Sequence, residues 1–97
     1  MPSTITTRIL RYLIAHPDAK DTASGIARWW LRGTKPRIDE IEAVLNVLVS
    51  ERWLKQRISL AGETLYSVNK RYLSRIRLYL MEEARREKEK KENNGKS

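Results

Sequence analysis

The chain has 97 residues, enough for one small domain with a single core. It has no cysteine and a single histidine, His16, which excludes disulfide frameworks and thiol catalysis and argues against His-rich metal sites and Ser-His-Asp catalysis. Twenty Lys and Arg residues against twelve Asp and Glu give a formal net charge of +8, which is common in small domains that bind a polyanion such as nucleic acid.

The longest apolar stretches, residues 9–15 and 44–49, are much shorter than the roughly 18–20 residues of a membrane-spanning helix. The first residues, MPSTITTRIL, lack the charged lead and long apolar run of a signal peptide. We therefore expect a cytoplasmic protein with no membrane partner. We also expect no metal and no cofactor.

Helical periodicity dominates the first half of the chain. Apolar residues recur at spacings of three and four over 6–15, 23–31 and 36–51, which predicts three helices. Pro17 ends the first helix, Asp21 or Thr22 caps the second, and Pro36 fits the first turn of the third. The buried face of the third helix is predicted to hold Ile38, Ile41, Val44, Leu45, Leu48 and Val49. The core is predicted to gather Ile9, Leu13, Ile26, Trp30, Ile41, Leu45, Leu48, Trp53 and Leu54.

After Trp53 the period changes from about 3.6 to two. Residues 54–60 and 64–68 alternate around a short Ala-Gly-Glu turn, which predicts a two-stranded β-hairpin. Residues 70–84 return to a helical pattern, and 85–97 form a charged tail that we expect to fray or be disordered. The predicted organisation is thus a domain over 1–69, a helix over 70–84 that docks or dimerises, and the tail.

Residues 5–69 resemble a winged helix-turn-helix domain. TASGIARWW (22–30) is similar to the second-helix pattern T-x-x-x-I-A-x-x-L, IEAVLNVLVSERWL (41–54) to the recognition-helix pattern, and YSVN (66–69) to the closing wing strand Y-x-L-T. The resemblance implies an α+β, mostly α fold with three helices, a two-stranded hairpin wing and a long C-terminal helix. One departure concerns the end of the third helix, because Arg52 stands where the pattern has glycine.

The distribution of charge bears on DNA binding. Residues 37–51, the predicted third helix, carry a net charge of −3, whereas residues 52–77 carry +6. Carboxylates in a first helical turn complement the positive end of the helix, but they also oppose entry into a phosphate-lined groove. The sequence therefore favours phosphate contacts from the wing and the start of the last helix over a recognition helix deep in the major groove. The predicted DNA contacts are Lys35, Arg37, Arg52, Lys55 and Arg57.

The last helix carries more apolar side chains than one stripe holds. One face can dock on the domain, while Leu78 and Met81 lie elsewhere around the helix. An exposed apolar strip suggests a partner helix, and in PadR-like and MarR-like regulators terminal helices dimerise, which is what the resemblance implies here. The alternative is a helix that wraps its own domain. The predicted homodimer interface is Leu73, Ile76, Leu78, Tyr79, Leu80 and Met81.

Two functions compete. The first is a small, dimeric winged-helix transcription regulator that binds double-stranded DNA. The second is a winged-helix module for protein contact, whose acidic third helix meets a basic partner. An enzyme ranks last, because the chain contains none of the motifs G-x-x-x-x-G-K-[ST], G-x-S-x-G or H-E-x-x-H.

Overall fold

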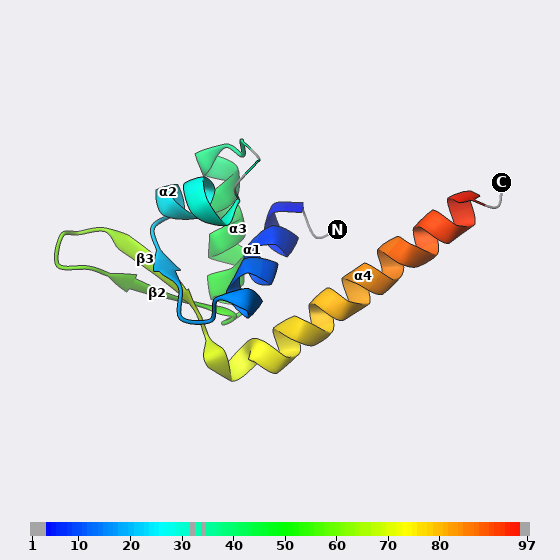
Figure 1. Cartoon of the computed structure of the whole chain (residues 1–97). Helices are drawn as coiled ribbons and strands as arrows, with labels where there is room; N and C mark the ends of the chain where they lie inside the picture. Colours follow the sequence, from blue (N-terminus) through cyan, green and yellow to red (C-terminus); the bar gives the residue numbers. More distant parts are fainter. Residues whose placement is uncertain (1–3, 32, 34, 96–97) are drawn as a thin grey trace.

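The computed structural model describes residues 4–31, 33 and 35–95, so residues 1–3, 32, 34 and 96–97 of the predicted ranges lie outside it. A helical body carries a β-hairpin on one side, and a long last helix projects from the other (Figure 1). The elements in chain order are α1 (Thr4–Ala15), β1 (Lys20–Asp21), α2 (Ala23–Gly25), a π-helix η1 (Ile26–Trp30), α3 (Ile38–Ser50), β2 (Leu54–Ile58), β3 (Thr64–Val68), a 3₁₀ turn η2 (Lys70–Tyr72) and α4 (Leu73–Gly95).

Among the described residues the sheet has three strands, not the two predicted. Its order is β1-β3-β2, and both pairings are antiparallel. The sequence did not reveal β1 because a strand of two residues is too short to show a period of two. Its pairing of Lys20 with Ser67 and of Asp21 with Tyr66 fastens the segment after α1 to the hairpin.

The predicted second helix is divided. Thr22 caps its start, where the Gly25 amide donates to Thr22 Oγ1 at 3.1 Å. The chain then widens into the π-helix, in which the Leu31 amide donates to the Ile26 carbonyl at 3.1 Å. The extra residue per turn lets Trp30 and Leu31 both enter the core, while Trp29 remains 57% exposed.

One apolar cluster joins α1, η1, α3, the sheet and the first turns of α4. Trp30 stacks on Tyr12 of α1 with ring centroids 4.9 Å apart. The predicted core is confirmed in this cluster, except that Trp53 is half-buried against the edge of the Tyr79 ring. Ile38 was wrongly placed in the core: it is 43% exposed, because it opens the first turn of α3 at the periphery.

The hairpin is covered only near its base. Leu54, Tyr66 and Val68 are buried, but Ile58 is 69% exposed and Leu60 fully exposed. The alternation in the sequence suggested a half-buried strand to its end. The hairpin instead extends beyond the helices, so no layer covers its distal half (Figure 1).

Helix α3 ends in a tight left-handed turn at Arg52, whose φ is 68°. The Trp53 amide donates to the Leu48 carbonyl and the Arg52 amide to the Val49 carbonyl, both at 3.0 Å, which is a Schellman motif. Asn69 Nδ2 donates to the Arg52 carbonyl at 2.9 Å and holds the turn from the far end of β3. The missing glycine is thus replaced by a strained arginine rather than by a different helix end.

Replacing Arg52 with glycine should stabilise the protein. A side chain in the left-handed region costs about 1–2 kcal/mol, and part of the gain is lost to the greater freedom of glycine in the unfolded chain. We expect Arg52→Gly to raise the free energy of unfolding by about 0.5–1 kcal/mol and Tm by roughly 2–8 °C in thermal unfolding. Arg52→Ala, which also removes the charge but keeps Cβ, is the control and should show no such gain. An equal gain in both variants would assign the effect to charge instead of backbone strain.

The first turns of α4 are part of the domain. Ile76 is fully buried, and Leu73, Tyr79 and Leu80 pack partly against the core. Burial, with the Glu83 carboxylate, raises the pKa of the Tyr79 hydroxyl. Ile76 is therefore removed from the predicted dimer interface, since it is already covered within one chain. The helix continues to Gly95, beyond the predicted end at residue 84 and through most of the predicted tail.

Candidate nucleic-acid interface

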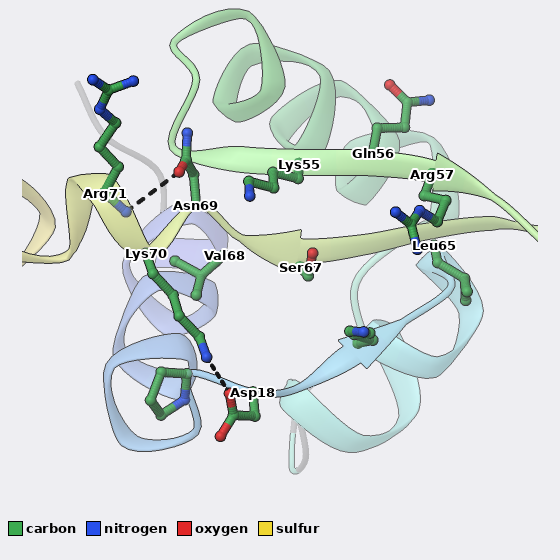
Figure 2. A pocket seen from close by; sticks show the side chains of 12 residues that line it. Asp18, Lys55, Gln56, Arg57, Leu65, Ser67, Val68, Asn69, Lys70 and Arg71 are labelled. Atoms are coloured by element: carbon green, nitrogen blue, oxygen red, sulfur yellow. Dashed lines mark hydrogen bonds and ion pairs between the residues drawn. The ribbon is translucent and has the colours of Figure 1, made fainter.

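An open groove of about 1000 Å³ lies on one face of the sheet. It is bounded by the loop after α1, by all three strands and by η2, the 3₁₀ turn that precedes α4 (Figure 2). We call it the sheet groove and define it by its charged lining residues, Asp18, Lys20, Lys55, Arg57, Lys70 and Arg71. Five of these six side chains are basic, so the groove has the chemistry of an anion-binding site.

Strand register produces this concentration of charge. Ser67 of β3 pairs with Lys20 on one side and with Lys55 on the other, so the three residues form one row across the sheet. The next row on the same face pairs Leu65 with Arg57. Figure 2 shows Lys55, Ser67 and Arg57 along this face of the two long strands. Two strand spacings, about 10 Å, separate the Lys20 and Lys55 backbones.

An ion pair closes one end of the groove. Lys70 Nζ donates a hydrogen bond to Asp18 Oδ1, which links the loop after α1 to η2 (Figure 2). This hydrogen bond and the charge of Lys70 lower the pKa of the Asp18 carboxyl, and Lys20 adds a smaller effect. Beside the pair, the Arg71 amide donates to Asn69 Oδ1 and begins the 3₁₀ turn. At neutral pH the opposite charges of Lys70 and Asp18 cancel. The excess positive charge of the groove comes from the other basic residues, Lys20, Lys55, Arg57 and Arg71.

Helix α3 packs on the face of the sheet opposite to the groove. Successive residues of a strand point to opposite faces, so Tyr66 faces away from Ser67 and the groove. Tyr66 is buried, and its pKa is raised by that burial and by the carboxylate of Glu42 on α3. The acidic helix and the basic groove are therefore separated by the sheet.

The exposed side of α3 is acidic, as predicted. Asp39, Glu40 and Glu42 are exposed in its first turns. Arg37 precedes the helix, and its guanidinium Nη2 lies 3.3 Å from Asp39 Oδ2, so its charge is already paired. The carboxylates stabilise the positive end of the helix but give this surface the wrong sign for phosphate.

The five predicted DNA contacts are all exposed, but the structure does not bring them together. Lys55 and Arg57 lie in the sheet groove, whereas Lys35 and Arg37 precede α3 and Arg52 occupies the turn after it. Lys20 also lines the groove, and sequence reasoning missed it because the two-residue strand β1 shows no period of two. Lys70 and Arg71 belong to the basic segment noted in the sequence, but only the fold places them beside Lys20.

Within the part of the chain that the structure describes, no helix is long and apolar enough to cross a membrane. The same residues contain no group of three or more His, Asp or Glu side chains placed to hold a metal ion.

No protein-family model matches the chain, and no curated protein matches it in sequence. A solved structure does match in fold: MepR, a transcription regulator of the Staphylococcus aureus multidrug efflux pump MepA. The match has a TM-score of 0.59 and covers 96% of this chain and 70% of that one, at 14% sequence identity. The chain thus has a winged helix-turn-helix fold, with β2 and β3 as the wing and α3 in the place of the recognition helix.

Proposed function

We propose that the chain is a winged-helix transcription regulator that binds double-stranded DNA as a homodimer. The observation that carries the proposal is the combination of a winged-helix fold, shared with a transcription regulator, and a wing whose groove is lined by five basic side chains. Phosphate is the ligand that this chemistry suits, and basic contacts of this kind give DNA affinity independent of sequence. Lys55 and Arg57 are the first contacts, with Arg52 just before β2 as a further one, whereas Lys35 and Arg37 precede the acidic α3 on the surface that repels phosphate.

The test is duplex binding as a function of salt. A protein that neutralises several phosphates releases counterions, so its affinity falls steeply as salt rises. With four groove contacts per protomer, and therefore eight in the dimer, the plot of log K against log salt should have a slope of about −7. Fluorescence anisotropy of a labelled short duplex between about 50 and 200 mM salt measures it. No affinity at low salt would contradict the proposal and would favour the protein-contact function of the acidic α3.

The dimer part of the proposal is supported by the surface of α4. Leu78 is 56% and Met81 68% exposed, three residues apart on a helix that projects from the domain (Figure 1). Residues at this spacing share a helix face, and a partner copy of α4 would cover both. The other predicted interface residues, Leu73, Tyr79 and Leu80, pack partly against the core on the opposite side of α4, so Leu78 and Met81 form the centre of the proposed contact.

Carboxylates on this strip should dissociate the dimer. We expect Leu78→Glu with Met81→Glu to shift the mass seen in sedimentation velocity from dimer to monomer, because burying two unpaired charges opposes association. Leu60→Glu places a carboxylate on a fully exposed apolar position at the far end of the molecule and is the control. A monomeric wild-type protein at high concentration would contradict the dimer.

A further inference from the structure

We propose that duplex DNA is held by its sugar-phosphate backbone in the sheet groove, on the side of the sheet away from α3, and that α3 does not enter the major groove. This inference rests on the proposed function and specifies the surface that performs it. It differs from the usual arrangement of a helix-turn-helix domain, in which the recognition helix lies in the major groove and reads the bases.

The first step of the argument is the opposite sign of the two faces. The sheet groove has five basic side chains and one carboxylate, and that carboxylate is paired with Lys70. The exposed first turns of α3 carry Asp39, Glu40 and Glu42, and the nearby Arg37 is paired with Asp39. A phosphate backbone is attracted to the first face and repelled by the second.

The second step is the separation of these faces. Tyr66 is buried on the helical side, where burial and, to a smaller extent, the Glu42 carboxylate raise its pKa, while its neighbour Ser67 lies in the basic row between Lys20 and Lys55. One straight duplex cannot lie against both sides of the same sheet. The charges therefore favour the sheet groove as the DNA-binding surface. A duplex held there cannot take α3 into its major groove at the same time, because α3 lies on the other side of the sheet.

The third step is the shape of the groove. Its basic side chains come from β1, β2 and η2, so they are distributed along an open trough (Figure 2). A backbone segment presents repeated phosphates along its length, and a distributed row of cations meets several at once. The predicted binding is governed by backbone contacts and DNA shape, with little direct reading of bases.

Two matched pairs of single substitutions test the inference by anisotropy with a labelled short duplex at low salt. Lys20→Glu in the groove is compared with Lys35→Glu before α3, and Asp18→Asn in the groove with Asp39→Asn on α3. Each pair changes the net charge equally, so only position differs. Circular dichroism and thermal unfolding check that every variant folds.

We expect Lys20→Glu to weaken binding about tenfold and Lys35→Glu by less than about threefold. Asp18→Asn should tighten binding by about two- to threefold, because it removes the only groove carboxylate among the described lining residues and releases Lys70, whereas Asp39→Asn should leave affinity unchanged. A larger loss for Lys35→Glu than for Lys20→Glu, or tighter binding only in Asp39→Asn, would overturn the inference and leave DNA binding intact. Absence of duplex binding by the wild-type protein would overturn the proposed function and the inference with it.

Discussion

Truncating Leu45 to alanine should nearly unfold the protein. Leu45 is fully buried at the centre of α3, where it belongs to the one cluster that joins α1, η1, the sheet and α4. Removing a buried leucine side chain costs about 2–5 kcal/mol, which is a large part of the roughly 5–15 kcal/mol that stabilises a small domain. Urea unfolding should show a clearly lower midpoint, and Tm should fall by more than about 10 °C.

Val47→Ala is the matched control for this prediction. Val47 lies on the same helix, two residues away, but it is 60% exposed. Its truncation should change the free energy of unfolding by no more than about 0.5 kcal/mol. Equal losses in the two variants would show that helix propensity, rather than packing of this face, determines stability. Unchanged melting of Leu45→Ala would mean that the buried face of α3 is wrong.

Reversing both wing charges should remove most DNA affinity. Lys55 and Arg57 lie in the sheet groove on the exposed strand β2, so Lys55→Glu with Arg57→Glu leaves the core untouched. We expect the affinity for a duplex at low salt to fall at least about tenfold, and the salt slope to become shallower by about 4, since two phosphate contacts are lost from each protomer of the dimer.

The control carries the same change in net charge elsewhere. Arg8 and Arg11 are both exposed on α1, so Arg8→Glu with Arg11→Glu repeats the double reversal without touching the groove. Its affinity should fall much less and its salt slope should stay close to that of the wild type. Equal losses in the two double variants would show that net charge, and not the groove, determines binding.

Periodicity in the sequence was sufficient for the elements that carry long apolar stripes. The helices α1 and α3 and the hairpin lie within a few residues of their predicted ranges, and the core around Ile41 and Leu45 follows from a spacing of three and four. The end of α3 was also visible in the sequence, because Arg52 occupies the place that usually requires glycine.

Features that depend on pairing between distant segments could not be predicted. Strand β1 exists because Lys20 and Asp21 find partners on β3, more than forty residues later, and two residues leave no pattern of their own. The sheet groove depends on the same register, so Lys20 could not be assigned to it. The π-helix widens to seat both Trp30 and Leu31 in the core, a demand of packing that local spacing does not express.

The most direct test of DNA binding through the sheet groove is an NMR titration of the wild-type protein with a short duplex at low salt. The account predicts that the largest amide shifts occur at Lys20, from Lys55 to Arg57 and from Ser67 to Arg71, with smaller shifts along α3. Shifts confined to the exposed face of α3, from Asp39 to Val47, would contradict this surface, and a spectrum unchanged by saturating duplex would contradict DNA binding itself.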